Sequence, residues 1–151
     1  PQNPKTPTHS PFNSIYRTIM VDPSFNEILE NLWLGNLASA EICAPQVSTT
    51  HMLSVGCSPP QQITDSIEHL YIQIQDQPEA SILPELDRAV DFIKEGLHQG
   101  VVFVHCYQGI SRSSTCVLAY FIRERKMDYY NALAFLQKQR KEVNPNEGFR
   151  G

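Results

Sequence analysis

The stretch of the sequence that most constrains the fold is residues 101–123, VVFVHCYQGISRSSTCVLAYFIR. Its first four residues are uniformly apolar and mostly β-branched, which is typical of a central strand covered on both faces. The spacing of Val117, Leu118, Phe121 and Ile122 predicts an amphipathic helix after the loop. In open α/β sheets, ligands bind beyond the carboxyl ends of strands, where the next helix begins. The sequence therefore predicts a binding loop at residues 105–113, HCYQGISRS.

Strand and helix patterns alternate along the rest of the chain. We expect strands over 32–34, 51–55 and 70–74, and Gly35-Asn36 is a turn signal after the first of them. Helices are expected before Gly100 and over 128–142, from the helical spacing of two sets of apolar residues: Ile82, Leu86, Ala89, Val90, Ile93 and Leu97, then Ala132, Leu133, Phe135 and Leu136. The predicted fold class is α/β, a single domain with a central, mostly parallel sheet flanked by helices.

The two ends of the chain differ from its middle. Residues 1–23 hold five of the eleven prolines, a composition typical of an extended arm or linker. We therefore place the folded domain at 24–151. Near the end, Asn144-Pro145-Asn146 predicts a turn into a final helix, which Gly151 cuts short.

Composition excludes several classes of protein. A chain of 151 residues with 41% hydrophobic and 19% charged residues is typical of one globular domain. Its net charge of −4 argues against nucleic-acid or anionic-membrane partners, and no apolar run is long enough to span a bilayer. Four cysteines without a C-x-x-C pair favour reduced thiols in the cytoplasm or nucleus. We expect no metal and no other cofactor.

The loop after VVFV has the composition of a phosphate-binding nest. Its backbone amides can converge on one anion, and Gly109 suits a position that needs a positive φ or a close approach. Cys106 then lies at the bottom of the nest, where amide dipoles and a helix N-terminus favour thiolate over thiol. The residues expected to surround a bound phosphate are Tyr107, Gln108, Gly109, Ile110, Ser111 and Arg112.

Three neighbours of the loop have expected roles of their own. Arg112 supplies a planar fork of donors that matches two phosphoryl oxygens. Ser113 can donate a hydrogen bond to the sulfur and ease its departure in a second step. His105 precedes the thiol and is expected to support the loop through its ring nitrogens.

A thiolate that displaces an alkoxide or phenoxide from phosphorus needs a proton donor for the leaving oxygen. Asp76 follows the strand at 70–74, and the loops after parallel neighbouring strands lie at the same edge of a sheet. Asp76 is therefore the candidate general acid, and its carboxylate would activate water in the second step. Glu79 is the second choice, and Asp65 and Asp87 are less well placed.

HCYQGISRS matches the H-C-x-x-G-x-x-R-S/T signature of cysteine-dependent protein phosphatases, and its G-x-S-R-S form resembles the dual-specificity branch. The resemblance extends to ENLWLGNLASA, THMLSV and RKMDYYNALAFLQKQRKEVNPNEGF, so it covers about residue 25 to the end. It implies a two-step hydrolysis of phosphotyrosine and phosphoserine or phosphothreonine through a phosphocysteine. Asp76 matches that family's general acid. The implied partners are phosphorylated proteins, with a protein kinase as one candidate, and the oligomeric state is open.

Other readings stay open at this point. Cys106 could be a structural residue with Arg112 on the surface, and a sulfur-transfer domain also uses a loop cysteine, although it needs neither this arginine nor an acid. A non-catalytic phosphoprotein-binding pseudophosphatase and a phosphatase for a non-protein phosphoester are the remaining alternatives. Oxidation could also join Cys106 to another thiol in a disulfide, the candidates being Cys43, Cys57 and Cys116.

Overall fold

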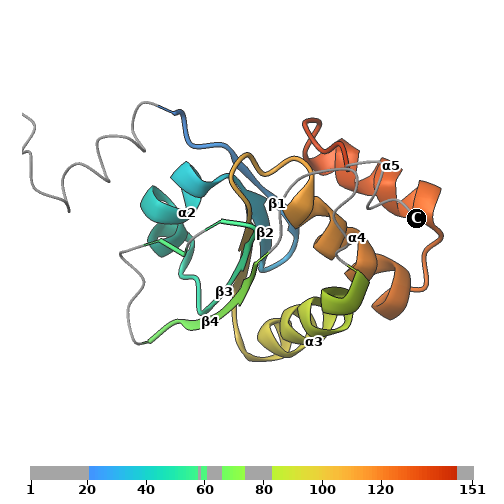
Figure 1. Ribbon diagram of the computed structural model, residues 1–151, viewed down its shortest axis with the longest axis horizontal. Coiled ribbons are helices and arrows are strands. Elements are labelled where there is room, and N and C mark those ends of the chain that lie inside the picture. Colours follow the sequence, from blue (N-terminus) through green and yellow to red (C-terminus); the bar gives the residue numbers. More distant parts are fainter. Residues whose placement is uncertain (1–20, 58, 61–65, 74–82, 146–151) are drawn as a thin grey trace, which may run out of the picture.

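The computed structural model describes residues 21–57, 59–60, 66–73 and 83–145. Its centre is a five-stranded sheet in the order β1-β2-β5-β3-β4, shown in Figure 1. The β1–β2 pair is antiparallel, and the β2–β5, β5–β3 and β3–β4 pairs are parallel. The predicted class, a mostly parallel sheet flanked by helices, is confirmed. The strands are β1 Phe25–Leu29, β2 Leu32–Gly35, β3 His51–Val55, β4 Glu68–Ile72 and β5 Val102–His105.

The strand predictions are right for β3 and within one residue for β2 and β5. The prediction for β4 is two residues late, because Glu68 to Ile72 pair in register with His51 to Val55. Strand β1 was not predicted, since its sequence FNEIL has two polar residues at its centre. It joins β2 through a tight turn in which Asn31 has a φ of 69°.

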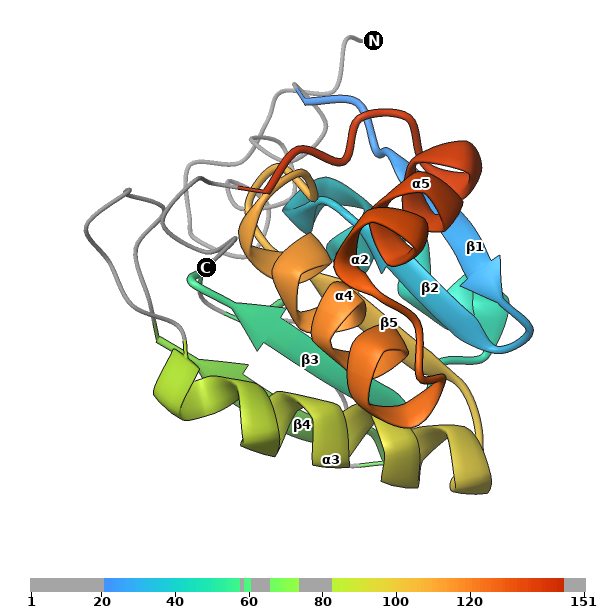
Figure 2. The same ribbon diagram turned by 90° about the vertical axis from the view of Figure 1, so that its right-hand side faces the viewer.

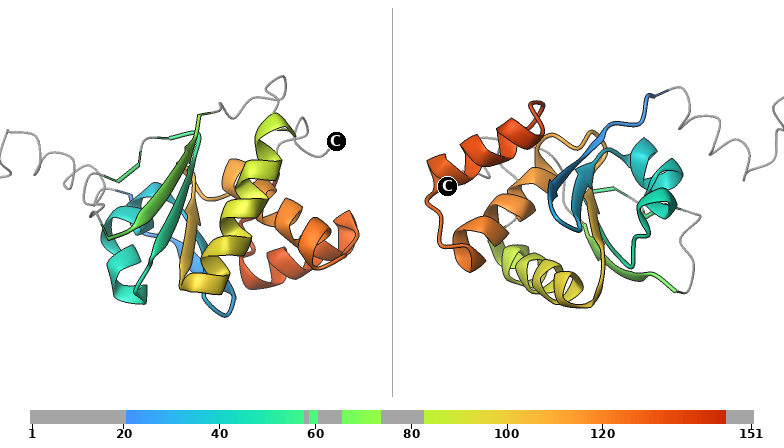
Figure 3. Two further views of the ribbon diagram at one scale, coloured as in Figure 1. Left: turned by 90° about the horizontal axis from the view of Figure 1, so that it is seen from below. Right: turned by 180° about the vertical axis from the view of Figure 1, so that it is seen from behind.

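Helices cover both faces of the sheet, as Figures 1 and 3 show. One face carries α3 Leu83–Gln99, α4 Arg112–Glu124 and α5 Tyr129–Gln139. The other carries α2 Leu37–Ile42 and the 3-10 helix η1 Ala44–Val47, neither of which was predicted. Asn36 begins α2, because its side chain accepts a hydrogen bond from the Ser39 amide at 2.9 Å. Among the helices of the described residues, none has both the length and the apolar character for crossing a membrane.

Alternating side chains of the strands build a separate core on each face. On β5, Val102 and Val104 belong to the larger cluster with the α3, α4 and α5 side chains, whereas Phe103 packs with Met52 and Trp33 on the α2 side. In α5, Ala132 and Leu136 are buried, and Leu133 and Phe135 are partly buried. In α4, Ile122 is 37% exposed, so it lies outside the core.

The parallel strands end together at one edge of the sheet. Gly35 at the end of β2 pairs with His105 at the end of β5, and Ser54 of β3 pairs with the same histidine. The chain then enters the loop that leads to α4. In Figure 2 this loop lies beside the segment that follows α5, and the Asn144 amide bonds the Ile110 carbonyl at 2.9 Å. The fold thus brings several segments to the edge at which Cys106 lies.

Candidate functional site

The backbone of the loop is held with its carbonyl groups facing outward. Every carbonyl from residue 107 to residue 111 accepts a hydrogen bond from outside the concave side of the loop. A trans peptide directs its N–H opposite to its C=O, and the chain has no cis peptide in the described residues. The loop amides are therefore left to face the concave side. The donors are the Leu37 amide for Tyr107, Arg140 for Gln108 and Gly109, the Asn144 amide and Ser114 for Ile110, and Ser114 and Thr115 for Ser111.

The sulfur of Cys106 lies inside this loop, and the residue as a whole is 2% exposed. The Gly109 amide donates to Sγ at 3.1 Å, and the Ser113 hydroxyl donates to it at the same distance. Two converging donors stabilise an anionic sulfur more than a neutral one. The site therefore directs two hydrogen-bond donors at Cys106 Sγ.

Gly109 is required at its position for two reasons. Its φ is +71°, which side chains rarely adopt, and a Cβ would lie 2.5 Å from the Gly35 carbonyl carbon. The same Cβ would lie 2.8 Å from Nη2 of Arg140. Any side chain here would push the loop away from β2 and disturb the amide that bonds the sulfur.

Arg112 is the first residue of α4, six residues after the cysteine. Its Nη1 donates to the Gly56 carbonyl at 2.8 Å, which ties the guanidinium to the loop after β3. A planar guanidinium has the fork geometry that matches two oxygens of a phosphoryl group. Tyr107 is 55% exposed, so its ring is available at the surface near the mouth.

His105 is fully buried behind the loop. Its Nε2 lies 2.6 Å from Ser54 Oγ and its Nδ1 lies 3.4 Å from the Cys106 carbonyl. Burial lowers the pKa of His105 to about 4, with the Cys106 carbonyl contact opposing and His69 adding to the shift. A neutral ring that donates from Nδ1 accepts from Ser54 at Nε2. His69 continues the chain, with its Nε2 at 3.0 Å from the Ser54 hydroxyl.

The other cysteines lie in different surroundings. Cys57 Sγ is 3.7 Å from His105 Nδ1, and burial together with the Cys106 charge raises the pKa of the Cys57 thiol to about 12. Burial likewise raises the pKa of Cys116, which lies in the core within α4. Cys43 ends α2. Of the disulfide candidates, Cys57 contacts His105, which is adjacent to Cys106, and Cys116 belongs to the same core cluster as Cys106.

The candidate acids are not all within the described part of the chain. Asp76, Glu79 and Asp65 lie outside the described residues, so their roles stay predictions. Asp87 lies in α3, is exposed, and forms a surface ion pair with Arg123 at 2.6 Å. Within the described ranges, no cluster of three histidine, cysteine or carboxylate side chains has the arrangement of a metal site.

Arg140 is a residue of the site that sequence reasoning missed. It lies at the end of α5, is 2% exposed, and donates to the Gly109 carbonyl at 2.9 Å. In the sequence it stands among charged residues, KQRKE, which is typical of a surface. One signal was present, because Arg140 follows the buried Ala132 and Leu136 at four-residue spacing and so continues the apolar face of the helix.

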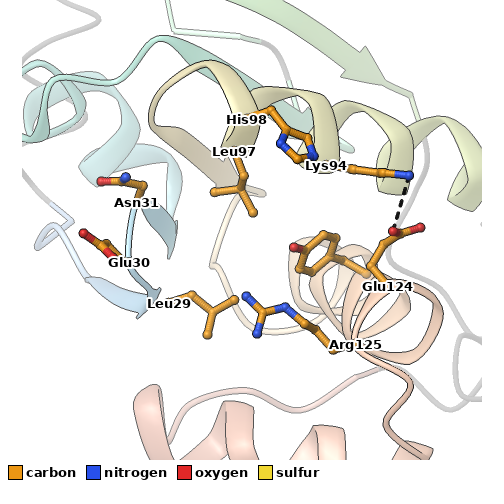
Figure 4. Close-up of a pocket in the computed structure, with 9 residues that line it drawn as sticks. Leu29, Glu30, Asn31, Lys94, Leu97, His98, Glu124 and Arg125 are labelled. Carbon is orange, nitrogen blue, oxygen red and sulfur yellow. Dashed lines mark ion pairs between the residues drawn. The ribbon is translucent and has the colours of Figure 1, made fainter.

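A cavity of about 540 Å³ lies at the other edge of the sheet, between the β1–β2 turn and the last turns of α3 and α4, as Figure 4 shows. Its cations, Lys94 and Arg125, are matched by Glu30 and Glu124, and Lys94 pairs with Glu124 at 3.5 Å. The thirteen residues of α4 separate it from the loop by about 20 Å. This balance of charge does not favour phosphate binding, so the cavity does not compete with the loop around Cys106 as the candidate phosphate site.

Comparisons with known proteins place the loop around Cys106 within a family of known sequences. The family model described as "Dual specificity phosphatase, catalytic domain" matches residues 32–151. The Drosophila melanogaster "Dual specificity protein phosphatase MPK-4" is 40% identical over an alignment of 132 residues, and the match covers 83% of this chain and 34% of the fly protein. The chain thus spans about a third of the length of that relative.

Two solved structures have the same fold. The structure of DUSP15 superposes with a TM-score of 0.77 at 32% identity, covering 83% of this chain and 82% of that one. The human tyrosine phosphatase-like serine/threonine/tyrosine-interacting protein superposes with a TM-score of 0.77 at 31% identity, covering 83% and 90%. Because the family model matches most of the chain and includes the loop around Cys106, this chain belongs to the dual specificity protein phosphatase family.

Proposed function

We propose that this chain hydrolyses phosphotyrosine and phosphoserine or phosphothreonine esters in proteins through a phosphocysteine intermediate. One observation carries the proposal. The five successive carbonyls of residues 107–111 are bound outward, so the inner side of the loop is lined by amides around Cys106. Inward amides of this kind bind the oxygens of a phosphoryl group. Membership of the dual specificity phosphatase family supports the same chemistry.

In the first step, the Cys106 thiolate attacks phosphorus, and an S–P bond forms as the P–O bond to the substrate breaks. The loop amides and the Arg112 guanidinium would bind the remaining phosphoryl oxygens and stabilise their charge in the transition state. The hydrogen bond from Arg112 to the Gly56 carbonyl holds the guanidinium in place, so little rearrangement is required when phosphate binds.

The departing oxygen needs a proton, and we assign its donation to Asp76. Asp76 follows β4, which is parallel to β3, and β3 is parallel to β5. The loops after these strands therefore leave the same edge of the sheet, which supports this assignment although Asp76 lies outside the described residues.

In the second step, water attacks the phosphocysteine, and the Asp76 carboxylate accepts its proton. The S–P bond breaks and the electron pair returns to sulfur as the thiolate. Ser113 supports this step, because its hydroxyl is 3.1 Å from Cys106 Sγ and would stabilise the leaving thiolate.

The proposed substrates are phosphorylated proteins, a protein kinase among the possible ones, in the cytoplasm or nucleus. Arg112 is the sole basic residue between Tyr107 and Ser113, which favours a single phosphoester over a polyphosphorylated small molecule. The exposed Tyr107 adds an aromatic surface near the mouth, where the ring or chain of a phosphorylated residue would enter.

A phosphopeptide panel with EDTA present tests the proposal. One peptide sequence carrying phosphotyrosine, phosphothreonine or phosphoserine is compared with an inositol polyphosphate, and both phosphate release and binding are measured. We expect turnover of the phosphotyrosine peptide and of at least one of the phosphothreonine and phosphoserine peptides. Binding without turnover would favour a phosphoprotein-binding role, which the name of the human interacting protein also suggests for that relative. Turnover of the inositol compound alone would favour a non-protein substrate.

A further inference from the structure

Arg140 carries a positive charge in the interior of the protein. It heads the set of largest fully buried side chains and is 2% exposed. Among the described residues, no carboxylate forms a salt bridge with it, and its hydrogen-bond acceptors are all neutral. A buried charge without an ionic partner is costly. Its retention at this place therefore requires a compensating interaction.

The guanidinium bridges the phosphate-binding loop and the edge strand. Its Nη1 donates to Ser24 Oγ at 2.9 Å and to Asn26 Oδ1 at 3.0 Å, both from the β1 side of the sheet. Its Nε donates to the Gly109 carbonyl at 2.9 Å. The β1 contacts thus fix the plane of the guanidinium, and that plane in turn sets the direction of the loop carbonyl.

One peptide unit connects Arg140 to the sulfur. The Gln108–Gly109 peptide offers its carbonyl to Nη2 of Arg140 at 3.4 Å, and its N–H donates to Cys106 Sγ at 3.1 Å. A donor on the carbonyl side of an amide polarises it and strengthens the hydrogen bond made by its N–H. The charge of Arg140 therefore polarises this amide toward the sulfur. An anionic sulfur would compensate the buried cation in addition to Glu142, which acts on Arg140 without forming a salt bridge with it.

We propose that Arg140 is a positioning residue that holds Cys106 in its thiolate form by polarising the Gln108–Gly109 peptide unit. Its role is electrostatic as well as mechanical, and it never contacts the substrate. The inference deepens the proposed function and rests on it, but the state of the sulfur can be measured without any turnover.

Other charged and titratable groups face the same sulfur or the same guanidinium. Glu142 acts on Arg140 from the segment after α5, and Cys106 acts on it from the loop. On the sulfur side, Cys57 after β3 and Cys116 in α4 act on Cys106, and Arg112 acts on Cys57. Substitutions at Arg140 leave these groups in place, so a difference between the variants is due to Arg140 itself.

Two substitutions separate charge from hydrogen bonding. Arg140→Gln keeps an N–H donor for the loop carbonyls but removes the charge, whereas Arg140→Lys keeps the charge and loses the planar fork. We expect iodoacetamide alkylation of Cys106 at pH 6 to slow about tenfold in Arg140→Gln, and to stay within about threefold in Arg140→Lys. Arg125→Gln, an exposed arginine at the far edge, is the matched control and should alkylate at the unchanged rate.

A purely mechanical role predicts the opposite order, with the glutamine variant near the unchanged protein, and that order would overturn the proposal. Thermal unfolding of each variant shows whether it is folded at the temperature of the assay. If Arg140→Gln lost thermal stability but alkylated at an unchanged rate, Arg140 would have only a structural role and the proposal would be wrong.

A measurement on the unsubstituted protein needs no variant to fold. In a pH titration followed by ¹⁵N–¹H NMR, the Gly109 amide and the Arg140 Nε–H should both shift with the midpoint at which Cys106 alkylation titrates. An Nε–H signal that stays fixed while the Gly109 amide moves would show that the two are not coupled. If the protein has no phosphatase activity, these readouts still decide the inference, so its failure is distinct from that of the proposed function.

Discussion

The hydroxyl of Ser113 donates a hydrogen bond to the sulfur of Cys106 at 3.1 Å across seven residues of sequence. This bond stabilises an anionic sulfur, and the sulfur becomes a leaving group only in the second step. Ser113→Ala should therefore lower kcat about tenfold or more, the value for a hydrogen bond to a charged group, and change kcat/KM little. Rapid-quench measurement should show a burst of product and accumulation of phosphoenzyme. An equal fall of kcat and kcat/KM without phosphoenzyme would assign Ser113 to the first step.

Cys106 supplies the attacking atom in the proposed reaction. Cys106→Ser should lower the turnover of an aryl phosphate by roughly four orders of magnitude or more, because a serine hydroxyl is a poor nucleophile without a base. Phosphopeptide binding should stay measurable by calorimetry, since the loop carbonyls keep their outward contacts. Cys43→Ser, at the end of α2, is the control and should keep its activity. Undiminished turnover by the Cys106 variant would mean that another group is the nucleophile.

Asp76 is proposed to protonate the leaving oxygen. Asp76→Asn should lower kcat/KM for phosphopeptides by about 10² or more, because their leaving groups are basic. The loss should be much smaller for p-nitrophenyl phosphate, whose leaving group needs no proton. Glu79→Gln provides the comparison, and a selective loss in that variant would transfer the role to Glu79. Equal losses of Asp76→Asn on both substrates would remove Asp76 from this role.

The parts of the site that the sequence predicted are those encoded within a few contiguous residues. Cys106, Gly109, Arg112 and Ser113 lie within eight positions, so a strand, a loop and a helix start suffice to place them together. The convergence of the loop amides on an anion was also predictable in outline, because Gly109 indicates a position with a positive φ. What a local pattern could not provide is the set of contacts that hold the carbonyls outward.

Apart from the local bonds of Ser114 and Thr115, those contacts come from distant segments. Arg140 bonds Gly109 across 31 residues and Ser24 across 116, and Ser54 meets His105 across 51. Strand β1 was missed for the same reason. The polar residues at its centre give no strand signal on their own, and the segment forms an edge strand because β2 pairs with it. Such pairings depend on the order of strands in the sheet, which residue periodicity leaves open.

His105 makes the stability of the fold depend on pH. Burial lowers the pKa of His105 to about 4 in the folded protein, against about 6.5 in an unfolded chain. Between these values the unfolded chain binds a proton that the folded protein does not bind, so stability falls as the pH falls. The stabilisation is complete above about pH 6.5 and is lost toward pH 4, by about 3 kcal/mol.

Comparison with His105→Gln isolates this contribution, because the carboxylates titrate alike in both proteins. Urea unfolding at pH 7, 5.5 and 4 should show the substituted protein as the less stable one at pH 7, since it loses the ring contacts with Ser54 and the Cys106 carbonyl. The difference in unfolding free energy should then narrow by about 3 kcal/mol at pH 4.

His69→Gln serves as a second comparison, because burial also lowers the pKa of His69 and its ring bonds the same Ser54 hydroxyl. Parallel pH profiles for His105→Gln and the unsubstituted protein would show that His105 does not titrate on unfolding in this range, and that the neutral ring is not what links the loop to β3.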